Sequence, residues 1–364
     1  MKSIFTHLFG SKQTDLSTPF SEAIIQNIKV RNTTFTIKYD ATNAGQLEQE
    51  IEQAMASLQT TSPYCYHNFS EYRYIYTEYD THISVEFHMT FKTNAAEEAY
   101  VQNQLQHIIS QLSPARKSDL ELVQAVHDYI ILNYSYNLQT KRSPYSVHTL
   151  LLEKQGVCQS MALLACALFD KLNIPCLYVT GHGNGEDHGW NLVQVGGDWY
   201  HLDITWDNPN FGKNIFENYR VNYQYFLLSD KKILKDHKID SRKYPAAKSE
   251  KYANLHEIVE SVRIGHTVYF PHKTQNEKLY KMDIHDPSFK LVPVIDTRVQ
   301  FLSSYNTTLY FSNYSDSGHL YSYTIAEQKL KQLTRFEITN TLIKNGNLYV
   351  ENVSGSVNCI ELKK

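Results

Sequence analysis

Alternation of hydrophobic and polar positions divides the first third of the chain into strands and helices. Residues 27–40 alternate with the period of a strand, after a polar stretch over residues 1–26 that predicts a flexible leader. Residues 43–59 repeat their apolar positions every three or four residues, which predicts an amphipathic helix. Residues 72–93 predict two strands joined by a central turn. We therefore expect a small α+β domain over residues 27–114.

The middle of the chain holds the strongest helix and hairpin signals. Ser118 followed by Glu121 forms a capping box, which predicts a helix start. Residues 158–172 form an apolar run that predicts a helix ending before Pro175, because proline disfavours helix at the preceding residue. The pair Gly196-Gly197 separates two strand-like stretches and predicts a two-residue hairpin turn.

The last third of the chain repeats. Tyr269, Tyr310 and Tyr349 occupy equivalent places in three stretches and are 41 and 39 residues apart. Each stretch predicts a strand, a polar turn and a second strand, at a period typical of a propeller blade. Three units are too few to close a propeller, which takes about four blades or more. We therefore expect a partial propeller or open β-repeat module over residues 251–364, with a role in binding rather than catalysis.

Composition limits the compartment and the partners. The chain has 364 residues, 42% of them hydrophobic, which is enough for about two or three domain cores. A net charge of −3 gives no reason to expect a nucleic acid or an acidic membrane as partner. The five cysteines form no CxxC pair, and neither a secretory signal nor a membrane span is recognisable. A soluble cytoplasmic protein is the expectation.

One cysteine differs from the others in its position. Cys158 begins the predicted apolar helix, where unpaired backbone N–H groups and the helix dipole favour a thiolate. Gly156, two residues earlier, is expected to let a substrate backbone approach the sulfur. Cys166 and Cys176 lie among apolar residues and are predicted to be packing residues. Cys158 is therefore a candidate nucleophile.

The predicted hairpin supplies a base and a group to orient it. With Gly196-Gly197 as the turn, Asp203 lies opposite Trp190. His188, two residues before Trp190, then lies on the same face and diagonal to Asp203, within reach of its side chain. A nucleophilic thiol needs such a base and such an orienting acceptor. His201 lies on the same face and is the alternative base.

A metal site is the competing hypothesis for these residues. Its candidate ligands would be Cys158, His182, His188 and His201. Their spacing matches none of the usual zinc signatures, and no second cysteine accompanies the first. The sequence therefore predicts neither a metal nor another cofactor.

The motifs "GVCQSMA" and "HGWNLVQVGGDWYHLDITWDNP" resemble the transglutaminase-like core of bacterial proteins, over about residues 115–210. The resemblance implies an α+β fold of papain-like arrangement, in which the helix bearing the cysteine packs on an antiparallel sheet. The expected catalytic domain is residues 115–250. Carried over to this chain, Cys158 is the nucleophile, with its backbone N–H as an oxyanion donor, His188 is the general base and acid, and Asp203 orients His188.

The same resemblance marks further positions. Four residues match motif positions that we interpret as structural: Trp190, Trp206, Asp207 and Pro209. Two residues depart from the family pattern: Ser160 stands where glycine is frequent, and Gly189 where alanine is common. Both departures are expected to alter the space around the site without removing a catalytic group.

The reaction implied is acyl transfer from an amide to the thiol. Water as acceptor makes the protein a peptidase or amidase, which is our expectation because hydrolysis is the commoner activity of bacterial relatives. The alternatives are a cross-linking transglutaminase, a deglycosylating amidase, and a non-enzymatic scaffold that uses the same fold. The expected partners are a protein or peptide substrate and a protein bound by the C-terminal repeats.

Overall fold

The chain forms two compact units. The computed structural model describes residues 19–41, 44–115, 117–208, 221–284, 286 and 288–362. Unit 1 consists of Met1–Arg116, Gln139–Gln194 and His237–Ala246, and unit 2 of Lys117–Leu138, Val195–Asp236 and Ala247–Lys364. Pro209 of the sequence motif and most of the predicted leader lie outside the described residues. Among the described helices, none has the length and apolarity needed to cross a membrane.

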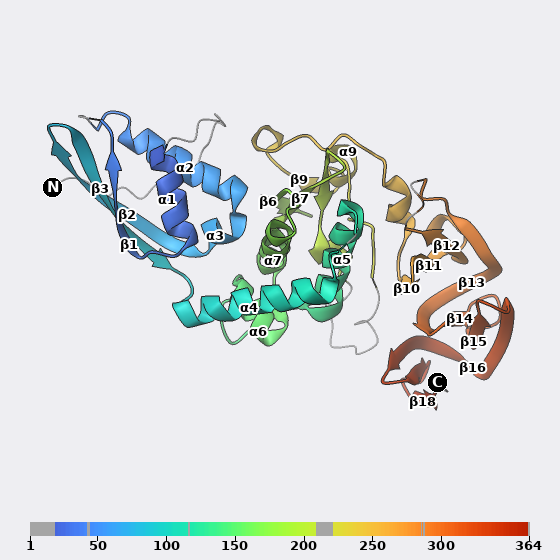
Figure 1. Ribbon diagram of the computed structural model, residues 1–364. Helices are drawn as coiled ribbons and strands as arrows, with labels where there is room; N and C mark the ends of the chain where they lie inside the picture. Colours follow the sequence, from blue (N-terminus) through green and yellow to red (C-terminus); the bar gives the residue numbers. More distant parts are fainter. Residues whose placement is uncertain are drawn as a thin grey trace. The chain divides into compact units, whose positions relative to one another are not determined.

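The N-terminal part of unit 1 is three helices on a three-stranded antiparallel sheet of order β1-β3-β2 (Figure 1). Its elements are α1 (Pro19–Lys29), β1 (Thr34–Tyr39), α2 (Leu47–Thr61), α3 (Pro63–His67), β2 (Phe69–Tyr79) and β3 (His82–Phe91). The burial of β3 alternates along the strand, as expected when one face of a sheet meets helices. The helix and the two joined strands predicted from the apolar pattern are therefore present.

The start of this part corrects the sequence interpretation. Residues 27–29 belong to α1, and the strand begins only at Thr34, whereas residues 27–40 were expected to be strand after a flexible leader. The apolar residues Phe20, Ile24 and Ile28 are buried and lie four residues apart, which is a helical spacing. Ile28 therefore belongs to a helical pattern that precedes the strand alternation.

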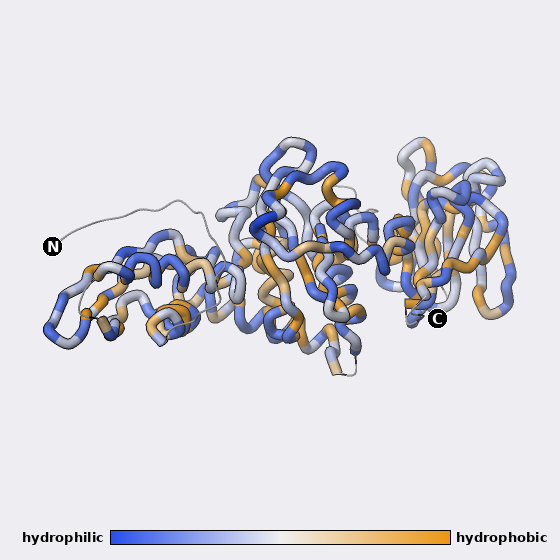
Figure 2. Tube along the Cα trace, turned by 90° about the horizontal axis from the view of Figure 1, so that it is seen from above, coloured by the Kyte–Doolittle hydropathy of each residue, from blue (hydrophilic) through white to orange (hydrophobic). Residues whose placement is uncertain are grey.

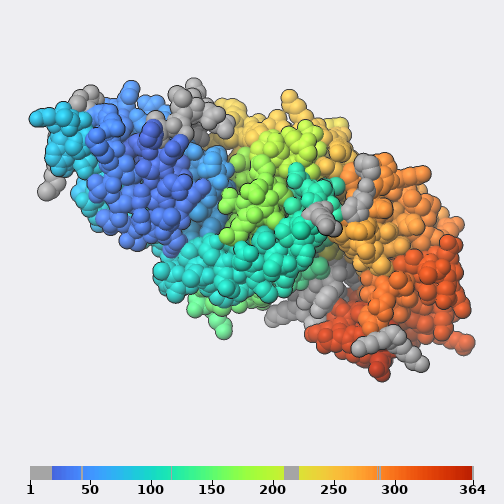
Figure 3. Space-filling model, viewed as in Figure 1, coloured from blue at the N-terminus to red at the C-terminus, as the bar shows by residue number. Residues whose placement is uncertain are grey.

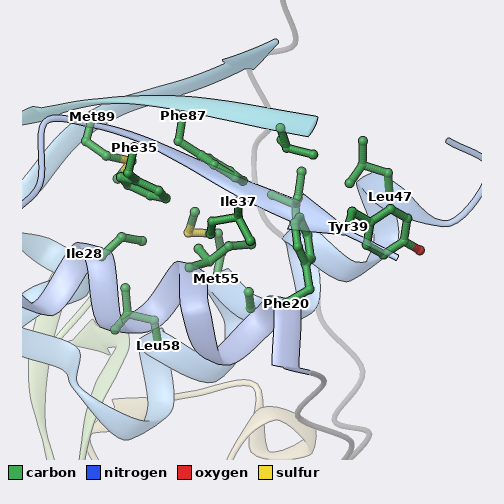
Figure 4. Close-up of a cluster of buried hydrophobic side chains, with 14 of the residues drawn as sticks. Phe20, Ile28, Phe35, Ile37, Tyr39, Leu47, Met55, Leu58, Phe87 and Met89 are labelled. Atoms are coloured by element: carbon green, nitrogen blue, oxygen red, sulfur yellow. The ribbon is translucent and has the colours of Figure 1, made fainter. Parts of the chain in front are cut away.

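Side chains from both layers form the core of this part (Figure 4). Phe87 of β3 stacks on Phe35 of β1 with ring centroids 5.0 Å apart. Ile28 of α1 and Leu58 of α2 are fully buried against the same cluster. This core attaches α1 and α2 to the sheet and so supports α3, which carries residues discussed below.

The rest of unit 1 carries the predicted apolar helix on an antiparallel sheet. Its elements are α4 (Ala95–Leu112), α6 (Val147–Glu153), β5 (Gln155–Gly156), α7 (Cys158–Lys171), β6 (Cys176–Gly183), β7 (Glu186–Val195) and β9 (His237–Lys238). Strand β6 pairs with β7 on one side and with β9 on the other, both antiparallel. The apolar run thus forms a helix that ends before Pro175, as predicted.

Unit 2 begins with the helix whose start the capping box predicts. The Ser118 hydroxyl accepts a bond from the Glu121 backbone N–H, and the Glu121 carboxylate accepts one from the Ser118 N–H at 2.9 Å. Gly196 and Gly197 have φ of 60° and 91°, the left-handed values that a two-residue turn before β8 requires. The short elements of this unit are α5 (Asp119–Asn133), β4 (Ser135–Tyr136), β8 (Asp198–Leu202), α8 (Ile204–Asp207) and α9 (Asp230–Ile233).

The C-terminal repeats form a nine-stranded antiparallel sheet in which every strand pairs with its neighbour in sequence. The strands are β10 (Val262–Ile264), β11 (Thr267–His272), β12 (Lys278–Asp283), β13 (Val292–Tyr305), β14 (Thr308–Asn313), β15 (His319–Thr324), β16 (Lys329–Lys344), β17 (Asn347–Asn352) and β18 (Val357–Glu361). Hydrophobic and hydrophilic residues alternate in short stretches along them (Figure 2), and the orange to red residues form a contiguous surface (Figure 3).

Each predicted repeat is one hairpin of this sheet. Tyr269, Tyr310 and Tyr349 all lie at the third position of the first strand of their hairpins. Between the hairpins run the long strands β13 and β16. The first half of β13 pairs with β12 and its second half with β14, and β16 joins β15 to β17 in the same way. Successive repeats therefore share a strand.

Replacement of Phe87 by alanine tests the core of the N-terminal sheet. Phe87→Ala is expected to lower the free energy of unfolding by about 3–5 kcal/mol, because the ring is fully buried and leaves a cavity. Urea unfolding followed by circular dichroism measures the change. Tyr79→Ala, at the exposed end of β2, is the control and should cost far less. Equal costs for the two variants would contradict the assignment.

Candidate active site

Cys158 is the first residue of α7 and is partly exposed. The preceding turn is closed by Ser160, whose buried hydroxyl accepts a bond from the Val157 N–H and donates one to the Val157 carbonyl, both at 3.0 Å. A Cβ on Gly156 would overlap the Ser160 hydroxyl and lie 3.1 Å from the Pro144 carbonyl. Gly156 therefore makes room for Ser160, and not for a substrate backbone as the sequence suggested.

Helix α7 is held against β6 and β7 by a short ladder of contacts. The Asn191 side-chain amide on β7 donates to the Ala162 carbonyl at 3.0 Å and lies 3.1 Å from the Cys166 sulfur. The sulfurs of Cys166 and Cys176 are 3.5 Å apart. These two cysteines pack against each other between the helix and the sheet, and they are thiols rather than a disulfide.

The ladder fixes the height of Cys158 along the sheet. Cys166 lies at the level of Cys176, whose strand partner is Val193, and Ala162 lies at the level of Asn191. Four helix residues rise about 6 Å and two strand residues about 6.7 Å, so each helical turn matches one step along the strand. Because Cys158 precedes Ala162 by one helical turn, we expect it to lie beside the part of β7 that precedes Asn191.

Tyr178 occupies the space beside Gly189. A Cβ at position 189 would overlap the Tyr178 hydroxyl, so the tyrosine ring lies across the glycine. Burial and the charge of Cys158 raise the pKa of Tyr178, which agrees with a hydroxyl that lies near the sulfur. The departure from the family pattern at Gly189 thus has a steric reason. The ring of His67 contacts Tyr178 edge-on, with centroids 4.8 Å apart.

His188 precedes Gly189, and alternation along β7 directs its side chain to the face that also carries Trp190. Its ring stacks on Trp190 at 5.6 Å and lies 5.5 Å from the ring of His237. The ring nitrogens of the two histidines lie within 4.8 Å of each other. Among the described residues, no hydrogen bond joins the Cys158 sulfur to His188. Nothing in the sequence around His237, on the short strand β9, indicated this neighbour.

Asp203 follows β8 and caps α8 within unit 2. It is fully buried, and one carboxylate oxygen accepts bonds from the backbone N–H groups of Thr205 at 3.0 Å and Trp206 at 3.1 Å. Its own N–H donates to the Tyr225 carbonyl at 3.0 Å. The orientation of this carboxylate is therefore fixed by the backbone that follows it.

Two histidines that the sequence offered as alternatives have carboxylates of their own. His201, the alternative base, is fully buried with Nε2 2.9 Å from Asp230, whose second oxygen accepts the Ala247 N–H. His182, one of the candidate metal ligands, lies 3.2 Å from Asp187 on the exposed end of the hairpin. Both imidazoles therefore pair with carboxylates outside the predicted triad.

A buried network in unit 2 supports the segment that carries Asp203. His127 of α5 lies between two carboxylates, with Nδ1 2.9 Å from Asp128 and Nε2 3.2 Å from Asp207. The other Asp207 oxygen accepts the Tyr225 N–H at 2.9 Å. Burial alone would lower the pKa of His127, but the hydrogen bonds to both carboxylates raise it to about 9. Burial raises the pKa of Asp207 to about 6, although the hydrogen bond and the charge of His127 act to lower it.

From the sequence motif we interpreted Asp207 as structural, whereas no motif pointed to His127. The only signal was a histidine on the apolar stripe of a predicted helix, which is also typical of a residue that merely packs. Between about pH 6 and 9 both members of the pair carry charge. The network therefore attaches α8, and with it Asp203, to α5.

The part of the chain that holds these residues has known relatives. Residues 106–204 match the family described as the transglutaminase-like superfamily. Over this stretch the chain is similar to that superfamily. Kyphoscoliosis peptidase of Mus musculus is 23% identical over 171 residues, which are 42% of this chain and 26% of that protein. The Homo sapiens protein of that name is 24% identical over 162 residues, 40% of this chain and 24% of that protein.

This chain thus spans about a quarter of the length of the curated relatives it matches. Among solved structures, one described as a TGase aligns with 47% of this chain and 50% of its own, at 11% identity and a TM-score of 0.28. The similarity to the transglutaminase-like superfamily therefore depends on the family match over residues 106–204 and not on this superposition.

The His127 network is expected to make stability depend on pH. The pKa of about 9 in the folded protein lies above the ordinary value of 6.5, so the network stabilises fully below pH 6.5. The free energy of unfolding is expected to fall by on the order of a few kcal/mol as the pH rises through 9 and His127 loses its proton. Urea unfolding at pH 6.5 and 9.5 measures this loss. His127→Gln should be less stable at pH 6.5 and show a smaller change, and an equal change in both proteins would contradict the role.

Proposed function

We propose that this protein is a cysteine-dependent hydrolase of amide bonds, a peptidase or amidase. The observation that carries the proposal is the position of Cys158. It is a partly exposed thiol at the first residue of a buried apolar helix, which Asn191 holds against β7, the strand that carries His188. The thiolate is the attacking form of a cysteine.

In the proposed reaction the Cys158 sulfur attacks the carbonyl carbon of the amide. His188 takes the thiol proton and gives it to the leaving amine, so that a thioester on Cys158 and a free amine result. Water then attacks the thioester, its proton passes through His188, and the acid and the thiol are released. The backbone N–H of Cys158 would stabilise the negative oxygen formed in each attack.

Asp203 is proposed to orient His188. Two observations support this role, each within its own part of the chain. The turn at Gly196-Gly197 has two residues. A turn of this length is the one from which the sequence places Asp203 diagonal to His188. The carboxylate is buried and its direction is fixed by two backbone N–H groups, which suits a group that must hold an imidazole in one orientation.

We prefer hydrolysis over cross-linking because of the names of the curated relatives. The curated proteins that match this chain carry the name peptidase. Their similarity covers 42% and 40% of this chain and about a quarter of their own length, and it supports the type of reaction rather than a particular substrate.

Thiol reactivity tests the nucleophile and its base. Iodoacetamide at about pH 6 should alkylate Cys158 at least tenfold faster than the other four cysteines, because only a thiolate reacts readily. His188→Ala should remove this advantage. His182→Ala is the matched control, since His182 lies on the same hairpin and already pairs with Asp187. Peptide mass spectrometry measures the rates, and uniform slow labelling of all five cysteines would refute the assignment.

The fate of the thioester separates hydrolysis from cross-linking. A glutamine-containing protein is incubated with the enzyme and a fluorescent primary amine. Cleavage or deamidation without incorporation of the amine is expected, and Cys158→Ala should abolish it. Mass spectrometry identifies the products. Incorporation of the amine as the main product would show that the acceptor is an amine and overturn hydrolysis.

A further inference from the structure

A cavity of about 620 Å³ lies in unit 1 next to the helix that bears Cys158. Its walls come from α3, the start of β2, the end of β3, the segment that leads into α6, and the first two turns of α7. Gln159, the residue after Cys158, lines it, and so does Leu163 one turn later. The N-terminal α+β part therefore contributes directly to a cavity beside the candidate nucleophile.

A second chain of contacts joins the cavity to the site. His67 lines the cavity and contacts Tyr178 edge-on at 4.8 Å. Tyr178 in turn lies across Gly189 and interacts electrostatically with Cys158. A molecule in the cavity would thus contact Gln159, the residue that follows Cys158 in α7.

The charge of the cavity favours an anion. Lys92 lines it, and in the described part of the chain its ammonium has no ion pair. None of the described lining residues is an aspartate or glutamate. Glu98 lies behind the wall, where it pairs with Arg31 at 3.4 Å and accepts bonds from Tyr64 at 2.8 Å and Asn68 at 2.9 Å. Its charge is therefore already engaged, and Lys92 is left to face the cavity.

His67 adds a polar group that lacks a partner. Its Nε2 atom is buried and has no hydrogen bond within the described residues. Burial lowers the pKa of His67 to about 4, so the ring is neutral at physiological pH and offers one donor and one acceptor. A buried polar atom without a hydrogen-bond partner destabilises the fold, and a ligand that supplies the missing bond removes this cost in free energy.

We propose that this cavity is a substrate subsite that binds a carboxylate of the peptide, with Lys92 as its ion-pair partner and His67 as a hydrogen-bonding partner. The carboxylate belongs either to an acidic side chain or to the C-terminus of the substrate. The assignment as a substrate subsite rests on the proposed amidase function. The preference for a carboxylate rests on the cavity alone.

Affinity selection with synthetic peptides tests the subsite. Two pools of random hexapeptides, one with free and one with amidated C-termini, are passed over immobilised full-length Cys158→Ala protein. Retained peptides are identified by mass spectrometry. Enrichment of aspartate and glutamate by about tenfold or more is expected in the amidated pool if a side chain is bound. Enrichment only in the free pool, without acidic residues, assigns the C-terminal carboxylate instead.

Variants on the same Cys158→Ala background attribute the effect to the cavity. Lys92→Met should remove the enrichment, and His67→Phe, which keeps an aromatic ring against Tyr178, should reduce it severalfold. Lys171→Met is the control, because this exposed lysine ends α7 at the far side of the helix from Cys158. No enrichment, or enrichment that Lys92→Met leaves intact, would overturn the proposal.

The two proposals fail separately. The selection uses a protein without the nucleophile, so it reports on binding whether or not Cys158 is catalytic. Carboxylate selection together with an unreactive Cys158 would keep the subsite and refute the hydrolase. A reactive Cys158 without carboxylate selection would keep the hydrolase and refute the subsite.

Discussion

The side-chain amide of Asn191 fixes α7, the helix that begins with Cys158, against the sheet. It is buried on β7 and donates into α7 at the Ala162 carbonyl, while the same nitrogen contacts the sulfur of Cys166. A bond to a helix carbonyl permits little sliding, since a shift of one residue would leave the buried amide without its acceptor. The place of Cys158 beside β7 follows from this contact.

Much of the central domain could be predicted because its signals are local. The turn at Gly196-Gly197 needs left-handed backbone, and Ser118 with Glu121 specifies a helix start within four residues. What failed depends on distant partners. Ile28 was assigned to a strand because Phe20 and Ile24, which share its helical spacing, lie in a stretch that was interpreted as a polar leader. His127 contacts Asp207, and His67 contacts Tyr178, at distances along the sequence that no periodicity reveals.

Ser160 and Gly189 each lie beside a residue whose size fits theirs. Ser160 is larger than the glycine frequent at its position, and Gly156 lacks the Cβ that would overlap its hydroxyl. Gly189 is smaller than alanine, and Tyr178 fills the space. In each pair the glycine leaves the space that the side chain of its neighbour fills, as close packing of an interior requires. The sequence shows each departure, but only the fold shows its partner.

The shared strands of the repeat module have a consequence for how it is built and lost. In a solenoid of separate repeats, one unit can fray while its neighbours stay folded. Here β13 and β16 each continue from one hairpin into the next, and one buried cluster that includes Leu279, Leu302 and Leu309 spans β12, β13 and β14, so melting the first hairpin would expose apolar side chains of the second. The module therefore behaves as one cooperative body, and a repeat could be gained or lost only as a block that begins and ends inside a strand.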